Sequence, residues 1–402
     1  MNIFYKAFCR IYQFCFKLAL PILPYRKPVI LDSEEEIVDV LKKENINKIM
    51  VATGQGIVKA GLLQPLLRIL DKANIEYVVY DGTVPNPTIN NIEEARKLYL
   101  ENNLEGIVAL GGGSVLDLAK VVLARVVKPK KSVQKMKGLL KINKKIPLLI
   151  AIPTTAGTGS EVTIAAVITD SDTHHKYPIN DFCLIPHYAV LDYKTTLGLP
   201  PFITATTGMD ALTHAVEAFI GNTRTKETKR MALEATRLIV QNLKECYHNP
   251  MNEEARRNML YASHYAGIAF TKSYVGYVHA IAHTLGGKYN IAHGLANAVI
   301  LPIMLEEYGS SVYKKIKDLA VYAGIAKKED SKELATNKFI NWIYDANKEM
   351  GIPLNIKDIN ENDIDELAVL ASKEGNPLYP VPKLMGIKQL KQMYYKIKNK
   401  ER

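Results

Sequence analysis

The sequence predicts an α/β domain followed by an all-helical domain, with a short helical extension in front of both. Strand-like and helix-like segments alternate from residue 29 to residue 199, which is typical of a parallel sheet covered by helices on both faces. Beyond Leu199-Pro200-Pro201 there are almost no β-branched alternating runs, and helical periods fill the chain. We therefore expect three parts, residues 1–28, 29–199 and 200–402.

Residues 1–28 are predicted to form an amphipathic helix, because their aromatic and aliphatic side chains recur at helical spacing. Lys6, Arg10 and Lys17 interrupt every apolar run before it reaches the ~20 residues that span a bilayer. We favour a helix packed on the body of the protein or on a second subunit, so a homo-oligomer is expected and membrane association is not. Attachment to a membrane surface is the alternative.

The α/β domain is predicted from alternating segments bounded by turn residues. Helices are expected at 57–71, 88–103 and 115–125, and strands at 48–53, 77–80, 106–110, 148–153, 162–169 and 189–192. The helical domain follows from apolar side chains recurring at a period of about 3.6 residues. Its helices are expected at 208–221, 225–248, 251–271, 276–287, 295–308, 310–325, 332–350, 362–374 and 386–400.

Composition narrows the class of function. The chain has 402 residues, of which 48% are hydrophobic and 23% charged, as in an ordinary globular protein. The net charge of +11 is spread along the chain, and its densest run, residues 128–145, holds eight lysines and no aromatic residue to stack on a base. We expect no nucleic-acid partner. The four cysteines lack CxxC spacing, which favours a reduced cytoplasmic compartment.

Two loops of the α/β domain have the chemistry of phosphate cradles. Gly111-Gly112-Gly113-Ser114 joins a strand to a helix, where glycines allow close approach of an anion to free N–H groups. The alternative is a simple capping box made by Ser114 and Asp117. The second loop, residues 153–161, offers the hydroxyls of Thr154, Thr155 and Thr158 to a pyrophosphate or ribose. Neither loop is the GxGxxG fingerprint.

The helical domain contains a candidate metal site. Asp210 and His214 are four residues apart, and so are His279 and His283, so each pair lies on one helical face. His293 follows Gly286-Gly287 and a short non-helical run, which would let the chain fold back. A carboxylate with imidazoles suits a divalent transition metal, and three or four ligands leave room for a substrate oxygen. We expect the ligand in a cleft between the domains. For any one histidine, a buried core position is the alternative.

Four motifs occur in order along the chain, GGGSVLDLAK, PTTAGTGSEVT, TGMDALTHAVEAF and HAIAHTLGGKYNIAHGLANAVILP. With these motifs, the chain from about residue 29 to the C-terminus resembles the iron-containing (group III) alcohol dehydrogenases. The resemblance implies a dinucleotide-binding domain and a helical metal-binding domain, an architecture shared with dehydroquinate synthase. It also implies a divalent metal, usually Fe²⁺ and sometimes Zn²⁺, that polarises the oxygen of a small primary alcohol or aldehyde while hydride passes to or from NAD(P).

The resemblance implies a role for individual residues. The metal ligands would be Asp210, His214, His279 and His293, while His283 would lie near the nicotinamide and relay a proton. The cofactor contacts would be Asn86, Gly112, Gly113, Ser114, Thr154, Thr155, Thr158 and Lys176, to which we add Gly54 and Asp117 as candidates.

Two departures from the family pattern concern the cofactor and the substrate. Gly54 stands where the family often has an aspartate that binds the ribose 2′-hydroxyl of NAD. Glycine removes that hydrogen bond and also the repulsion of a 2′-phosphate, so we expect NADP(H) to be accepted. Tyr274 stands where the family commonly has a small residue, and it either narrows the alcohol pocket or turns into the helical core.

Two other functions compete with the dehydrogenase hypothesis. A lyase like dehydroquinate synthase would use NAD only transiently, so net turnover of NAD(P)H separates the two. A non-catalytic, membrane-associated relative is the second alternative. Relatives that have lost activity have usually also lost metal ligands, and all four are present here.

Overall fold

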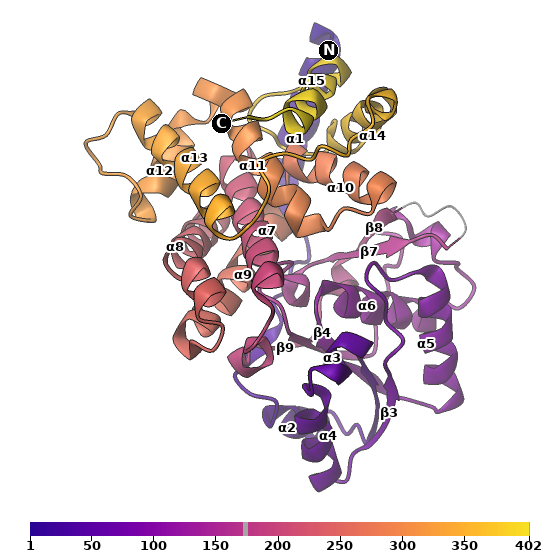
Figure 1. Cartoon of the computed structure of the whole chain (residues 1–402). Helices are drawn as coiled ribbons and strands as arrows, with labels where there is room; N and C mark the ends of the chain where they lie inside the picture. Colours follow the sequence, from indigo (N-terminus) through magenta and orange to yellow (C-terminus); the bar gives the residue numbers. More distant parts are fainter. Residues whose placement is uncertain (172–175, 402) are drawn as a thin grey trace. The chain divides into compact units, whose positions relative to one another are not determined.

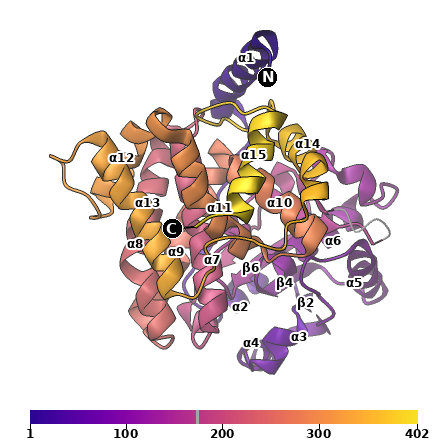
Figure 2. The same ribbon diagram turned by 45° about the horizontal axis from the view of Figure 1, so that its top comes forward.

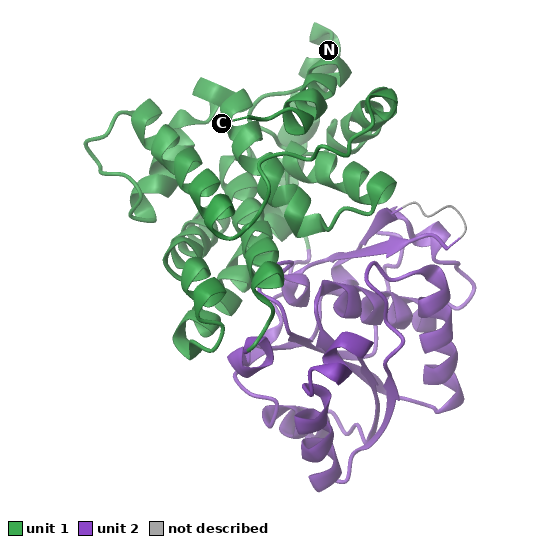
Figure 3. Cartoon of the chain, viewed as in Figure 1, with its two compact units in different colours: residues 1–23, 198–402 green, residues 24–197 purple. Residues whose placement is uncertain are grey.

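The computed structural model describes residues 1–171 and 176–401 (Figure 1). The chain forms two compact units, residues 24–197 and residues 1–23 together with 198–402 (Figure 3). The sequence set residues 1–28 apart as an extension, whereas the structure groups residues 1–23 with the helical unit. The reason is that α1 (Ile3–Ala19) hydrogen-bonds through Arg10 and Gln13 to backbone carbonyls of residues 377–382.

The α/β unit is built on a six-stranded sheet in the order β1-β9-β6-β4-β2-β3. All five strand pairs are parallel, which confirms the predicted parallel sheet. The strands are β1 (Val29–Leu31), β2 (Lys48–Ala52), β3 (Glu76–Tyr80), β4 (Gly106–Gly111), β6 (Leu148–Pro153) and β9 (Tyr188–Val190). The central strands β4 and β6 are buried along their whole length, as expected when helices cover both faces of a sheet.

Two apolar cores lie on the two faces of this sheet. Ile49 and Val51 of β2 join one core, whereas Met50 and Ala52 join the other, because successive side chains of a strand point to opposite faces. Helices α2 (Glu36–Lys43) and α4 (Leu63–Lys72) contribute to the first core, and α5 (Ile89–Glu101) and α6 (Gly113–Val127) contribute to the second.

The single helix predicted for residues 57–71 is wrong. The segment forms α3 (Gln55–Lys59) and α4, with Gly61 between them at a φ of 75°. Glycine adopts this left-handed conformation without a steric penalty, so the chain turns there. The strand predicted at 162–169 begins only at Ala165, because residues 160–162 form a 3₁₀ turn. This strand, β7 (Ala165–Thr169), pairs antiparallel with β8 (Lys176–Asn180), which the sequence did not predict, and β5 (Gly138–Leu139) completes this separate sheet.

The second unit is helical, as predicted (Figure 2). Its central helix, α7 (Pro201–Ile220), is buried at nearly every position from Thr204 onward. The remaining helices after α7 are α8 (Lys226–His248), α9 (Glu253–Ser273), α10 (Tyr277–Tyr289), α11 (His293–Tyr308), α12 (Tyr313–Tyr322), α13 (Lys332–Glu349), α14 (Ile364–Gly375) and α15 (Ile387–Lys398). Among the described residues, no helix combines the length and apolarity that crossing a bilayer requires.

Candidate metal centre

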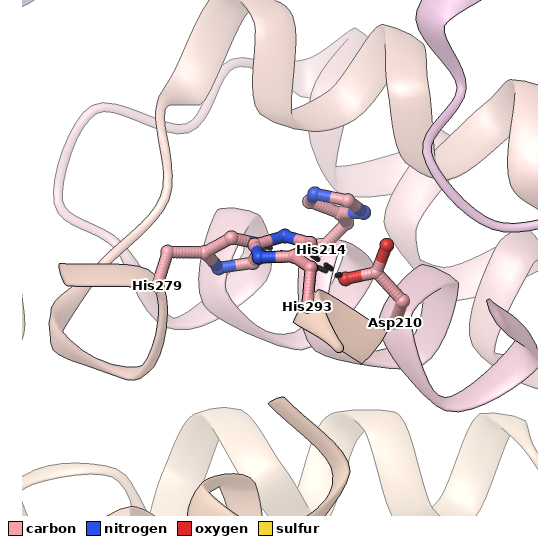
Figure 4. Close-up of side chains that lie close together, drawn as sticks. All are labelled: Asp210, His214, His279 and His293. Carbon is pink, nitrogen blue, oxygen red and sulfur yellow. Dashed lines mark ion pairs between the residues drawn. The ribbon is translucent and has the colours of Figure 1, made fainter. Parts of the chain in front are cut away.

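The four predicted metal ligands come together in the helical unit (Figure 4). Asp210 and His214 project from α7, His279 from α10, and His293 is the first residue of α11. One donor atom from each lies within 4.8 Å of the others. Asp210 Oδ1 is 3.5 Å from His293 Nε2 and 3.9 Å from His279 Nε2.

The turn that returns His293 to the site differs from the prediction. Gly286 and Gly287 lie inside α10 and do not form the turn. The helix ends instead at Asn290, which adopts a left-handed conformation with a φ of 54°. Gly294 then allows α11 to approach α7 closely, because a Cβ atom at this position would lie 2.4 Å from the carbonyl oxygen of Thr206.

The site is mostly buried but open on one side. Asp210, His214 and His279 are almost fully enclosed, whereas the His293 side chain is 35% exposed. Burial lowers the pKa of His279 well below its usual value, and the positive charges of neighbouring histidines, His214 first, lower it further. Both effects favour the neutral imidazole, which is the state that binds a metal.

Glu217 orients His279 and is a functional residue that the sequence did not predict. Its carboxylate lies 2.6 Å from His279 Nδ1 and also accepts the backbone N–H groups of Gly276 and Val278. Burial raises the pKa of Glu217 to about 7, while the backbone hydrogen bonds oppose that shift. A carboxylate on Nδ1 leaves Nε2 to face the metal, an arrangement common in metal sites. The available signal was the spacing of Glu217, three residues after His214.

Asn297 is a second residue that was missed, one helical turn after His293. Its fully buried Nδ2 atom lies 2.6 Å from Asp210 Oδ1, 3.1 Å from His293 Nε2 and 3.3 Å from His279 Nε2. A single N–H₂ group thus meets lone pairs from three of the four donors. Lone pairs that converge on one point are what a cation requires.

The donor set fits a divalent transition metal. Donors held about 2.1 Å from a common ion lie about 3.5 Å from one another, which is the Asp210–His293 separation observed here. Three imidazoles with one carboxylate suit Fe²⁺ or Zn²⁺ and leave a coordination position for a substrate oxygen.

His283 lies beside these four ligands and has its own partners. Its ring stacks on His293 with centroids 5.1 Å apart, and its Nδ1 atom is 2.6 Å from Glu374 Oε1. The hydroxyl of Tyr379 donates to the same carboxylate oxygen at 2.7 Å. Burial alone would lower the pKa of His283, but Glu374 reverses this, and the net shift is upward. Glu374 is 91 residues from His283, so no spacing motif could indicate this pair.

In the α/β unit, most predicted cofactor contacts gather where β4 and β6 end. Gly113 opens α6, and a Cβ atom there would lie 2.8 Å from the Thr158 methyl group; Gly112 similarly faces Thr155 at 3.4 Å. Ser114 Oγ accepts the backbone N–H of Asn86 at 3.2 Å. These groups therefore line the carboxyl edge of the parallel sheet, where ligands of such folds bind.

Three further predicted contacts flank this group. The backbone N–H of Thr154 donates to the Gly111 carbonyl, so its buried side chain is fixed beside the first loop. Lys176 of β8 pairs with Thr169 of β7. The backbone N–H of Thr169 donates to the carbonyl oxygen of Pro87, the residue after Asn86. Gly54 is the N-cap of α3 and forms a bridge with Gly82.

The capping box of Ser114 and Asp117, which was the alternative to a phosphate cradle, does not form. Gly112 is the N-cap of α6, and Asp117 points to the second loop instead. Its two carboxylate oxygens accept hydrogen bonds from Ser160 Oγ and from the Val167 N–H. Both oxygens of Asp117 are thus engaged within the unit, so we do not propose Asp117 as a cofactor contact. The buried ammonium of Lys120 also donates to Ser160, so the two side chains together fix the second loop.

Tyr274 is turned toward α1. Its ring meets Phe16 edge-on, with centroids 5.0 Å apart, and lies 6.2 Å from the ring of Tyr379. Burial raises its pKa to about 12. These contacts favour the second of the two predicted roles, in which Tyr274 packs within the helical unit.

Comparison with known families matches nearly the whole chain. Residues 31–193 match the family model described as iron-containing alcohol dehydrogenase, and residues 204–397 match the model of the Fe-containing alcohol dehydrogenase family, C-terminal. Alcohol dehydrogenase 4 of Saccharomyces cerevisiae is 36% identical over 327 residues, which cover 81% of this chain and 84% of the relative. The 1,3-propanediol dehydrogenase of Citrobacter freundii is 36% identical over 333 residues, covering 82% and 86%.

Solved structures show the same fold. The structure of a 1,3-propanediol oxidoreductase superposes with a TM-score of 0.89 at 32% identity and covers 93% of this chain and 99% of that one. Sulfoacetaldehyde reductase from Bifidobacterium kashiwanohense, solved in complex with NAD⁺, gives a TM-score of 0.82 at 29% identity, with 94% and 99% covered.

Proposed function

The chain belongs to the iron-containing alcohol dehydrogenase family, and from this premise we propose that it is a metal-dependent NAD(P) alcohol dehydrogenase or aldehyde reductase. The observation that carries the proposal is the convergence of Asp210, His214, His279 and His293 on one point. When bound there, Fe²⁺ or Zn²⁺ supplies Lewis-acid polarisation of a substrate oxygen. The glycine and threonine loops of the α/β unit would hold the nicotinamide cofactor, which carries the hydride.

A small primary alcohol or aldehyde is the proposed substrate. One of the relatives and one of the solved structures described above are named for 1,3-propanediol, and a second solved structure is named for sulfoacetaldehyde, and both of these molecules are short. In this chain, His293 provides the exposed side of an otherwise buried ligand set. A short aldehyde needs little space beside His293 to reach this ligand set.

Net cofactor turnover tests the proposal against the lyase alternative. With a panel of short aldehydes, the metal-loaded enzyme should consume NADH or NADPH in equal molar amount to the aldehyde. A lyase regenerates its nicotinamide in each cycle, so substrate conversion without net cofactor change would contradict the proposal.

The first prediction concerns the choice of cofactor. Because Gly54 has no carboxylate, NADPH should be used with a kcat/KM within about tenfold of that for NADH or above it. Asp81, which follows β3 and accepts a hydrogen bond from Gln55 at 2.7 Å, is the nearby carboxylate that would oppose a 2′-phosphate. Asp81→Asn should therefore raise the NADPH to NADH ratio of kcat/KM.

Steady-state kinetics with both cofactors check this prediction, and Asp71→Asn in α4 serves as a matched aspartate control. A preference of the wild-type enzyme for NADH beyond about tenfold, unchanged by Asp81→Asn, would refute it.

The second prediction concerns the proposed proton relay through His283. Glu374 holds the His283 ring through its 2.6 Å contact, so Glu374→Gln should lower kcat by about tenfold or more. Metal content should stay unchanged, because Glu374 contacts none of the four ligands in the described contacts. Glu366→Gln, on the exposed side of the same helix, is the control and should leave kcat unchanged.

An unchanged kcat in Glu374→Gln would remove His283 from the reaction. A fall in metal content would instead make Glu374 part of the metal site. Measurement of kcat together with bound metal distinguishes these results.

A further inference from the structure

The N-terminal helix α1 is attached to its unit by polar contacts along one side. Arg10 donates to the backbone carbonyls of Val381 and Pro382, and Gln13 donates to those of Pro377 and Tyr379, at distances of 2.7–3.2 Å. Cys9 and Gln13 are buried in this contact. These contacts determine which side of α1 packs against the rest of its unit.

The opposite side of α1 is apolar and exposed, which we call the outward face. A helical repeat of about 3.6 residues places it directly opposite Cys9 and Gln13. The outward face consists of Ile3, Phe4, Phe8, Ile11, Phe14 and Leu18, of which Phe4 is 84% exposed. Ile22, at the end of the 3₁₀ turn that follows α1, is 83% exposed and adds to this apolar surface. In Figure 2, α1 extends beyond the neighbouring helices of its unit. Contiguous apolar surface of this kind marks an interaction site.

The charges beside the outward face are positive. Residues 1–28 contain five basic residues and no acidic one. Lys6 and Lys17 are exposed on one flank of α1. Burial lowers the pKa of Lys315, and the positive charges of Arg224, Arg10 and Lys17 lower it further, to about 8, so these cations are close enough to act on one another.

This charge pattern distinguishes between possible partners. Pairing of α1 with α1 of a second copy would bring like charges together, with no carboxylate in the segment to neutralise them. An anionic lipid surface offers both the negative charge and the apolar layer. A helix with an apolar face and lysines on its polar flank lies in the plane of such an interface.

We propose that α1 binds the enzyme peripherally to anionic membranes, with the outward face inserted at the level of the headgroups and Lys6 and Lys17 on the lipid phosphates. The helix lies on the bilayer and does not cross it, in agreement with the lack of a spanning helix in the described residues. This inference is independent of the proposed function, because lipid binding is measured without substrate.

Vesicle co-sedimentation of the full-length protein tests the proposal. The protein should bind vesicles of phosphatidylcholine with phosphatidylglycerol and bind pure phosphatidylcholine vesicles much less. Phe8→Glu with Ile11→Glu should lower the partition coefficient by about 100-fold or more, since each side chain loses its burial. Lys6→Gln and Lys17→Gln should each lower it by roughly fivefold.

Met251→Glu with Leu334→Glu is the matched control, because both side chains are exposed and apolar in the same unit but lie outside α1. It should leave vesicle binding unchanged. Equal binding to neutral and anionic vesicles would overturn the choice of an anionic surface. Absence of vesicle binding would overturn the proposal, and if light scattering then showed that Phe8→Glu with Ile11→Glu halves the molecular mass, the outward face would be a self-association surface.

Discussion

Asp210→Asn should abolish metal-dependent turnover while leaving the protein folded. The amide keeps the shape of the side chain and can still meet Asn297, but it removes the only carboxylate among the four donors. Loss of an outer partner costs about 10–100-fold in metal affinity or activity, so loss of a direct donor should exceed that range. Metal content by mass spectrometry, kcat and the melting temperature measure the three parts of this expectation.

Two further variants are compared with Asp210→Asn, one expected to have a smaller effect and one expected to have none. Glu217 is not one of the four donors and reaches the metal site through His279, so Glu217→Gln should lower metal affinity or activity by about 10–100-fold. Asp345→Asn changes an exposed aspartate of α13 in the same unit and should have no effect. If Asp210→Asn retained stoichiometric metal and wild-type turnover, Asp210 would not be a ligand.

Gly294→Ala should damage the metal centre although glycine carries no ligand. A Cβ atom at this position would lie 2.4 Å from the Thr206 carbonyl oxygen and 3.5 Å from Asp210 Cβ. Since the first contact is with backbone, α7 and α11 must move apart, and His293 moves away from Asp210 with its helix. A displacement of this kind can cost about 100-fold in activity, and overpacking of the helix contact should cost about 1–3 kcal/mol of stability.

Gly287→Ala is the matched control for this prediction. Gly287 lies inside α10, and no atom outside its own helix lies within 4 Å of a Cβ added there. Alanine should stabilise the helix by up to about 1 kcal/mol and leave metal content and kcat unchanged. Thermal unfolding and metal titration of both variants check the pair. Equal behaviour of the two variants would show that the close approach at Gly294 does not position His293.

The ligands could be predicted from the sequence because two of them share a helical face. Asp210 and His214 are four residues apart on α7, and their position on one face does not depend on where the helix is predicted to begin or end. The partners of His279 and His283 could not be predicted from spacing along one helix. Glu217 lies 62 residues from His279, and Glu374 lies 91 residues from His283, so only the packed fold brings each pair together.

The errors in the predicted elements have local physical causes. The S-x-x-D pattern at Ser114 predicts a capping box only if Ser114 is the N-cap, but the N-cap of α6 is Gly112, two residues earlier. Gly286-Gly287 suggests a turn, but α10 continues through both glycines to Tyr289 and ends at the left-handed Asn290. The helical tendency of residues 1–28 was evident from the sequence, whereas the outward direction of its apolar face depends on contacts of Arg10 that span 371 residues.

Metal restoration tests the central claim most directly. The protein is stripped of metal under anaerobic conditions, and Fe²⁺, Zn²⁺ or buffer is added back before oxidation of NADH and NADPH is followed with short aldehydes. We expect no turnover without metal and recovered turnover with Fe²⁺ or Zn²⁺, because the chain provides one site with four convergent donors among its described residues. Turnover that is equal with and without metal, or absent under every condition, would contradict the assignment of this site as the catalytic centre of an alcohol dehydrogenase.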